Sequence, residues 1–254
     1  GAGSVQGGGE FPPGTSVTLT ATPSAGYLFN DWSGNLTGTQ NPATVTMNTD
    51  MTITANFEVR KYTVTVLVEG NGTVPGAGEY VQGTQVTLTA TPNTGHALLG
   101  WVRDYLTYLN PEGNSPSKSV SISSSDIRYK ALFSPIVEIT DANLEAAIRQ
   151  QLGWSNSNHP ELGVSLDRYP TQITQAHMEL LTRLWADDRD IAGLEGLQYA
   201  KNLETLDIQD NKIADPSHVW NLSKLRNLEI DGNRFTSLDG IEKLTGLEYV
   251  DLDS

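Results

Sequence analysis

The sequence predicts a multidomain chain in which two small all-β repeat domains precede an α/β solenoid of 22-residue turns with a helical N-terminal cap. Three observations lead to this prediction. One long motif occurs twice in the first half, an apolar pattern with a 22-residue period fills the second half, and an amphipathic segment lies between them. We place the domains at 1–59, 60–134 and 135–254, with the cap at about 138–184 and the turns at about 181–254.

The composition excludes several classes of protein and site. The 24 Gly and 12 Pro among 254 residues suit short strands and many turns. Without cysteine there is no disulfide, zinc–thiolate site or thiol nucleophile. A net charge of −14 disfavours binding to a phosphate backbone, so we expect no nucleic-acid partner. No apolar run approaches the ~20 residues that span a bilayer, so we expect no membrane span in this segment.

The first half contains two copies of one β unit. The residues GTSVTLTATP at 14–23 return as GTQVTLTATP at 83–92, and the same offset of 69 relates Trp32 to Trp101. Apolar residues alternate with threonine in these runs, which predicts half-buried strands. Further strands are predicted at 45–47, 51–57 and 62–68. We expect the two tryptophans to lie in the cores rather than to bind sugar, because both copies place the indole at the same point of the pattern.

The repeated motif, GTxVTLTATPxxGYxFxxW followed by TVTM and TITAxF, resembles the divergent internalin B-repeat family of bacterial surface proteins. The resemblance covers about half of the chain. The second copy departs from the motif in a longer loop between Trp101 and Val120, and at His96, Leu98 and Leu99. The resemblance implies a spacer or adhesive module of a cell-wall or secreted protein, without enzyme activity.

The second copy begins with a strand that the first copy lacks. Residues 62–68 precede Gly70, whereas the first copy starts at Gly1, which aligns with Gly70. A sheet without that strand exposes unpaired backbone and apolar side chains. Two explanations are open: the sequence is cut within the domain, or a neighbouring chain supplies the strand by β-augmentation.

The third domain opens with a predicted amphipathic helix at 141–152. Thr140 or Asp141 can cap its start and Gly153 ends it. Its apolar residues share one face, namely Leu144, Ala147, Ile148 and Leu152. A loop follows to about Thr171, and a second helix that runs into a strand is predicted at 174–184.

From Leu181 onward, apolar residues return every 22 residues in the pattern LxxLxLxxN. The columns are Leu181, Leu203, Leu225 and Leu247; Leu184, Leu206, Leu228 and Val250; and Ala186, Ile208, Ile230 and Leu252. This pattern is typical of a leucine-rich repeat, in which each turn adds one strand to a parallel sheet and the leucines fill a shared core. Asn211 and Asn233 form an asparagine column that can satisfy backbone groups. Arg189 occupies this position in the first turn, which we therefore expect to be irregular.

The cap DANLEAAIRQQLG and the turn DIAGLEGLQYAKNLETLDIQDNKI resemble the internalin family and its bacterial relatives. The departures are the long cap loop, from Gly153 to Thr171, and Arg189. The resemblance implies an extracellular or bacterial cell-surface location. It leaves the ligand open, because internalin-like solenoids bind unrelated partners.

The residues between the strand leucines are expected to line the concave face of the solenoid and to form the binding site. The candidates are Arg183, Trp185, Asp187, Thr205, Asp207, Gln209, Asn227, Glu229, Asp231, Tyr249 and Asp251. Residues 135–254 hold 21 acidic against 10 basic residues, so the face is acidic. It is either a solvated acidic surface or a site for a protein or glycan ligand, with Trp185 and Tyr249 as anchors.

We expect no cofactor and no metal. The alternative is a divalent cation held by Asp207, Glu229 and Asp231, because carboxylates are ligands for such ions, although EF-hand spacing does not occur. Catalysis is not expected. No catalytic motif is present, and the four histidines lie in unrelated predicted elements, namely His96, His159, His177 and His218.

The sequence therefore predicts a non-catalytic adhesion or recognition protein, with the β repeats as spacer and the solenoid as binding surface. One alternative is a structural subunit of an extracellular filament or layer, formed by self-association. Its support is that the first copy lacks its first strand and that the solenoid stops at Ser254 in mid-turn without a C-terminal cap, two facts that a truncated sequence explains equally well. The other alternative is an accessory region of a larger secreted enzyme.

Overall fold

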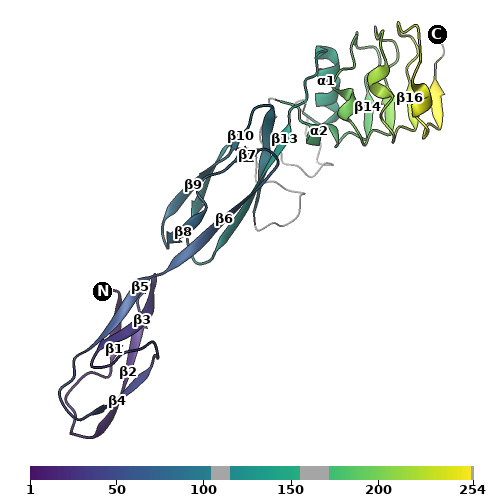
Figure 1. Ribbon diagram of the computed structural model, residues 1–254. Helices are drawn as coiled ribbons and strands as arrows, with labels where there is room; N and C mark the ends of the chain where they lie inside the picture. The colour runs from purple at the N-terminus through teal and green to yellow at the C-terminus, as the bar shows by residue number, and fades with distance from the viewer. Residues whose placement is uncertain (104–114, 155–171, 253–254) are drawn as a thin grey trace. The chain divides into compact units, whose positions relative to one another are not determined.

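The computed structural model describes residues 1–103, 115–154 and 172–252. Its contacts divide the chain into two compact units. One consists of Gly1–Thr65, Gly76–Leu88 and Lys118–Arg128, and the other of Val66–Pro75, Thr89–Ser117 and Tyr129–Ser254. Because this division falls inside the second β domain, the three domains are described in turn below, with the elements labelled in Figure 1.

The first β domain is built from two antiparallel sheets (Figure 1). Their strand orders are β1-β2-β4 and β3-β5. The strands are β1 (Gly3–Gln6), β2 (Thr15–Pro23), β3 (Tyr27–Gly34), β4 (Ala43–Met47) and β5 (Ile53–Val59).

The core of this domain confirms the alternating pattern of the sequence. Val17, Leu19 and Ala21 of β2 are buried between threonines that are exposed or only partly buried. Trp32 is 2% exposed, and its indole N–H donates to the Gln40 carbonyl over 2.9 Å. The indole therefore buries its apolar body while its one donor is satisfied, which confirms a core role for this tryptophan.

The second β domain repeats these elements and adds strands. Its strand orders are β11-β13-β6-β8, β12-β9 and β10-β7. The strands are β6 (Lys61–Glu69), β7 (Gly72–Thr73), β8 (Gly78–Val81), β9 (Gln85–Thr89), β10 (Thr91–Pro92), β11 (His96–Arg103), β12 (Ser117–Ser121) and β13 (Ile127–Pro135). Trp101 is fully buried and its indole N–H donates to the Ser115 carbonyl over 2.8 Å, as Trp32 does to Gln40.

The predicted helix at 141–152 is confirmed as α1 (Ala142–Gln151). The Asp141 carboxylate caps it by accepting from the backbone N–H groups of Asn143 and Leu144, and Gly153 follows the helix with a φ of +75°. Leu144, Ala147 and Ile148 are buried on its inner face.

The prediction that a helix runs into a strand within 174–184 is confirmed, with a short helix, since α2 spans only Gln175–Met178. Leu180 and Leu181 donate to carbonyls three residues earlier, so the chain leaves the helix in a tight turn. Met178 and Leu181 are both buried, and β14 starts at Arg183. Placing Leu181 in the core and pairing β14 with its neighbour outweighs continued helix formation.

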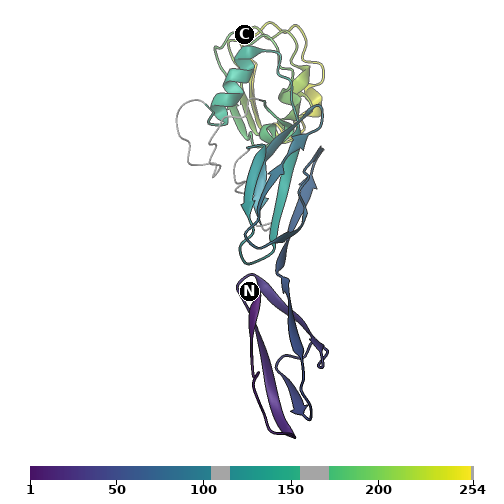
Figure 2. The same cartoon turned by 90° about the vertical axis from the view of Figure 1, so that its left-hand side faces the viewer.

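The rest of the third domain is a series of coils, each contributing one strand to a parallel sheet of order β14-β15-β16-β17 (Figures 1 and 2). The strands are β14 (Arg183–Trp185), β15 (Thr205–Asp207), β16 (Asn227–Glu229) and β17 (Tyr249–Asp251). Between strands lie short 3₁₀ helices, η2 (Leu197–Tyr199), η3 (Ser217–Val219) and η4 (Ile241–Lys243). Leu184, Leu206 and Leu228 are fully buried side by side, so the 22-residue period sets the strand register.

Candidate binding surface

All candidate residues lie on one face of the parallel sheet, in three rows that cross its strands. Because side chains alternate along a strand, those on either side of the buried leucines point away from the core. The first row is Arg183, Thr205, Asn227 and Tyr249, and the second is Trp185, Asp207, Glu229 and Asp251.

The third row, Asp187, Gln209 and Asp231, lies just beyond the strands. The ladder continues there, because the Ala186 N–H donates to the Asp207 carbonyl over 2.8 Å and the Ile208 N–H to the Glu229 carbonyl over 2.9 Å. Gln209 is tied to the second row through its Nε2, which donates to Glu229 Oε2 over 3.2 Å. Asp253, the next acidic position on this face in the sequence pattern, lies outside the described residues.

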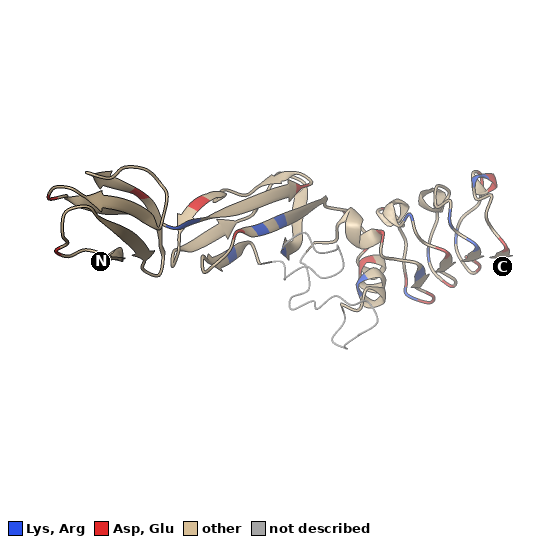
Figure 3. Cartoon of the chain, turned by 90° about the horizontal axis from the view of Figure 1, so that it is seen from below, with Lys and Arg blue, Asp and Glu red and all other residues tan. Residues whose placement is uncertain are grey.

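The carboxylates of this face disturb one another electrostatically. Partial burial raises the pKa of Asp207, and the charges of Asp187 and Asp231 raise it further, against a lowering by the Gln209 N–H. Burial also raises the pKa of Glu229, as do the charges of Asp207, Asp251 and Asp231. Acidic segments recur in successive coils in Figure 3. A cationic ligand would relieve this repulsion.

An exposed aromatic side chain lies on each outer strand of this face. Trp185 on β14 is 47% exposed and Tyr249 on β17 is 51% exposed. The Arg183 guanidinium lies 6.0 Å from the Trp185 ring centroid, and the Tyr249 hydroxyl donates to Asp251 Oδ2 over 3.2 Å. Tyr249 lies three strand spacings across the sheet and two residues along the strand from Trp185, which together is about 16 Å. The face therefore offers two apolar contacts with carboxylates between them.

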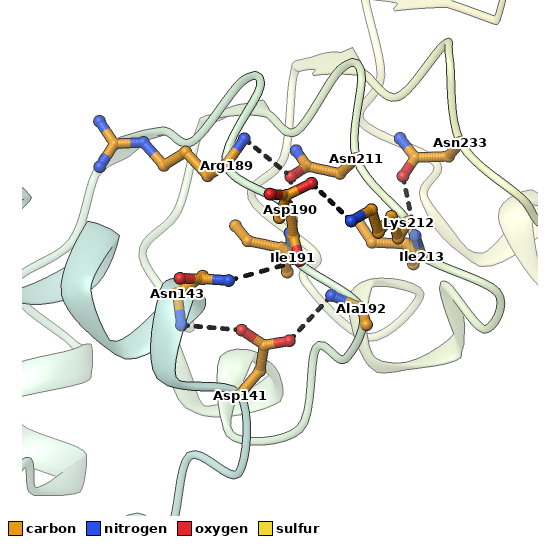
Figure 4. A network of polar contacts seen from close by, with 10 residues as sticks. All are labelled: Asp141, Asn143, Arg189, Asp190, Ile191, Ala192, Asn211, Lys212, Ile213 and Asn233. Atoms are coloured by element: carbon orange, nitrogen blue, oxygen red, sulfur yellow. Dashed lines mark hydrogen bonds and ion pairs between the residues drawn. The ribbon is translucent and has the colours of Figure 1, made fainter.

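Asparagine side chains hold the coils that carry this face (Figure 4). The Asn211 carbonyl accepts from the backbone N–H groups of Arg189 and Ile191, over 3.2 and 2.9 Å. Its amide donates to the carbonyls of Ala186, Ile208 and Gln209, over 2.8, 3.0 and 2.8 Å. One asparagine thus satisfies backbone groups of its own coil and of the preceding one.

The first turn is irregular, as its arginine predicts. Asp190, which follows Arg189, has a positive φ angle that its counterpart Lys212 lacks, whereas the positive φ of Asp188 recurs at Asp210 and Gly232 in the next coils. Arg189 cannot replace the asparagine, and its side chain instead donates to Gln150 Oε1 of α1 over 2.8 Å. The backbone of this turn is satisfied by Asn211 from the next coil, a role that the sequence pattern did not reveal.

Sequence reasoning also missed the second role of Asp141, which joins α1 to the first coil. Besides capping α1, its carboxylate accepts from the N–H group of Ala192 over 2.8 Å (Figure 4) and from that of Gly193 over 3.1 Å. Burial raises the pKa of Asp141, but the hydrogen bonds from Ala192, Leu144, Gly193 and Asn143 outweigh it and hold the pKa below its ordinary value. The local sequence pattern predicts the cap, but it cannot predict the contacts with Ala192 and Gly193, which lie 51 and 52 residues further along the chain.

The described residues give little support for a metal site or a membrane-spanning helix. No three His, Asp or Glu side chains within the described part are grouped so as to hold a metal ion. His96, His177 and His218 lie in β11, α2 and η3, while His159 is outside the described residues. No helix of the described ranges is long and apolar enough to cross a membrane.

Comparison with solved structures finds partial likenesses. An internalin (inlF) from Listeria monocytogenes is 32% identical with a TM-score of 0.37, covering 44% of this chain and 29% of that chain. An internalin C2 (inlC2) from the same species is 30% identical with a TM-score of 0.38, covering 45% of each chain. The chain thus spans less than half the length of these two structures.

The CBM51-2 and INT domains of Clostridium perfringens ZmpB are 28% identical with a TM-score of 0.29, covering 38% of this chain and 18% of that chain. No curated protein matches the chain. The model of the divergent InlB B-repeat domain matches residues 1–61 and again residues 62–137. Since these two matches together cover more than half of the chain, the chain belongs to the family of proteins that carry divergent InlB B-repeat domains.

Proposed function

We propose that this chain is part of a non-catalytic bacterial cell-surface or secreted protein, with the B-repeat domains as spacer and the third domain as the binding part. The third domain is, in this proposal, a leucine-rich-repeat domain with α1 and α2 as its N-terminal cap. Two features support it: strands that pair in parallel at a 22-residue spacing, and asparagines that bridge successive coils.

The observation that carries the binding role is the arrangement of exposed aromatics around clustered carboxylates on one sheet face. Aromatic side chains supply much of the binding energy at protein interfaces, and carboxylates steer and orient basic partners. The ligand that fits best is a protein segment rich in lysine or arginine. A glycan would use the aromatics but would gain little from the charges.

The test is binding of the purified chain to two immobilised panels, one of lysine- and arginine-rich peptides and one of neutral glycans. We expect binding to the peptides that weakens as salt rises. Trp185→Ala should reduce the affinity at least tenfold. The matched control is Tyr199→Ala, which removes an aromatic side chain from η2 that is 36% exposed but lies off this face. Equal affinities of the two variants would refute the assigned surface.

A further inference from the structure

Asn71 and Gly72 lie where β6 passes into β7, in a turn that both β domains share. At the same offset of 69 residues, the first domain has Ala2 and Ser24 where the second has Asn71 and Asn93. The Asn93 N–H donates to the Asn71 carbonyl over 3.1 Å, and the Ser24 N–H donates to the Ala2 carbonyl over 2.9 Å. The backbone contact is therefore the same in both domains, but the second domain has a side-chain amide where the first has a methyl group.

Packing on an aromatic ring requires glycine directly after this position. A Cβ built on Gly72 would lie 2.6 Å from the Phe133 ring, and one built on Gly3 of the first domain would collide with the Phe57 ring. Asn71 is exposed, and no other asparagine of the sequence precedes a glycine. The fold thus places an exposed side-chain amide beside the residue that has no side chain.

This arrangement leaves the backbone nitrogen of Gly72 open to reaction with its neighbour. The bond from Asn93 to Asn71 makes these two a hydrogen-bonded pair of the β7–β10 ladder, so alternation makes Gly72 and Pro92 a pair without hydrogen bonds. The Gly72 N–H therefore points away from β10. No strand of the described residues pairs with that other edge of β7. Without a Cβ on Gly72, its nitrogen can also approach the Asn71 Cγ closely.

The side chain of Asn93 prepares the carbon that would be attacked. Its Nδ2 donates to Asn71 Oδ1 over 2.5 Å. Attack at Cγ moves negative charge onto this oxygen, and a donor that is already directed at the oxygen stabilises that charge. The counterpart Ser24 instead donates to the Gly1 carbonyl over 3.1 Å. The second domain thus brings together an amide, a nucleophile and a donor that the first domain lacks as a set.

We propose that Asn71 is a site of spontaneous deamidation in the second β domain. The Gly72 nitrogen gives its proton to a base in the solvent and bonds to the Asn71 Cγ, and the side-chain nitrogen leaves as ammonia, which closes a succinimide ring. Water then opens the ring at either of its carbonyls. The product is an aspartate or a β-linked isoaspartate at position 71. The site is independent of the sheet surface proposed above.

The isoaspartate product does not fit the turn. It adds one backbone carbon between Gly70 and Gly72, and both glycines pack on Phe133, since a Cβ on Gly70 would collide with the Phe133 carbonyl oxygen. The longer backbone must move β7 away from the ring or from β10. Either product also adds a negative charge two residues from Glu69, in a chain of net charge −14. The second domain therefore loses stability as the chain ages.

The test follows the whole chain during incubation at pH 6 and at pH 8. A glutamyl endopeptidase cleaves after Glu69 and Glu79 and releases residues 70–79, in which Asn71 is the only side-chain amide. Mass spectrometry detects the exchange of amide for carboxyl in this fragment, and chromatography separates aspartate from isoaspartate. We expect both isomers, and a faster conversion at pH 8 because the attacking nitrogen must lose its proton. A fragment that stays unchanged in the folded chain, while it converts in the chain unfolded by urea, would overturn the proposal.

Two variants that carry the residues of the first domain separate the folded site from the dipeptide alone. Asn71→Ala removes the amide, so its unfolding temperature should stay constant through an incubation that lowers that of the unchanged chain. Asn93→Ser removes the donor and should slow the conversion by about threefold or more in the folded chain, but not in urea. Equal rates of Asn93→Ser and the unchanged chain in the folded state would overturn the part assigned to Asn93. An equal loss of unfolding temperature in Asn71→Ala would overturn the link between deamidation and stability.

Discussion

Replacing Asn211 tests the idea that one buried amide holds two coils together. In Asn211→Ala the N–H groups of Arg189 and Ile191 lose their acceptor, and three carbonyls lose a donor. An unsatisfied buried group costs about 1–3 kcal/mol, and carbonyls tolerate the loss better than N–H groups. We therefore expect the free energy of unfolding to fall by about 2–5 kcal/mol.

Asn211→Asp separates hydrogen bonding from shape, because the two side chains are nearly isosteric. One aspartate oxygen can still accept from Ile191, but the other faces the carbonyls of Ala186, Ile208 and Gln209. At pH 7 this variant should be less stable than Asn211→Ala. Repulsion and burial raise its pKa in the folded state, so its deficit should shrink as the pH falls and the carboxyl becomes a donor.

The assay is urea unfolding followed by far-ultraviolet circular dichroism, with amide hydrogen exchange at Ile191. The control is Asn233→Ala in the next coil, where the side-chain carbonyl accepts from Ile213 N–H alone and the residue is only partly buried. We expect about half of the loss seen at Asn211. The reasoning is refuted if Asn211→Ala costs less than about 1 kcal/mol, or if Asn211→Asp equals it at pH 7.

Three further predictions concern ionisable groups. Burial, and then the charge of Arg149, lowers the pKa of His177 to about 4. As the pH falls, the unfolded chain therefore binds the proton before the folded chain does, and the free energy of unfolding should fall by about 3 kcal/mol between pH 6.5 and 4. Urea unfolding at several pH values should show a weaker pH dependence for His177→Gln. Asp207→Asn should stabilise the chain by about 0.5 kcal/mol at pH 7, measured by thermal unfolding. The gain should be smaller in 1 M salt, which screens the charges of Asp187 and Asp231 but not the burial, and absent well below the raised pKa. Asp141→Ala should lower the free energy of unfolding in urea by about 2 kcal/mol or more, compared with ~1 kcal/mol for the loss of a simple helix cap, because the contacts to Ala192 and Gly193 are lost too. A smaller loss would show that water replaces the carboxylate.

Much of the fold follows from the periodicity of the sequence. Alternation in β2 and in its counterpart β9 marks the buried side chains, because successive residues of a strand point to opposite faces. The 22-residue period brings Leu184, Leu206 and Leu228 into register for the same reason, since only equal coils stack their leucines. The position of the candidate binding surface also follows from the sequence, because its residues lie next to the buried leucine of each strand.

The second helix shows where this reasoning stops. The sequence predicts that a helix runs into a strand within 174–184, but it does not set the boundary, and α2 ends at Met178. The helix competes with a strand that pairs only with residues in the next coil, and local propensity contains no information about that partner. Burial of Leu181 in the shared core decides the competition.

The sequence by itself determined the repeats, the strand and helix positions near them, and the acidic character of the sheet face, because these depend on spacing and composition. Only the tertiary structure decided which backbone groups Asn211 and Asp141 satisfy, since their partners lie up to 52 residues away. It alone showed how unequally the corresponding side chains of β5 and β13 are buried, because β13 has β6 beside it. Hydrogen bonds and burial join residues that are distant in the chain, and sequence pattern records only what is near.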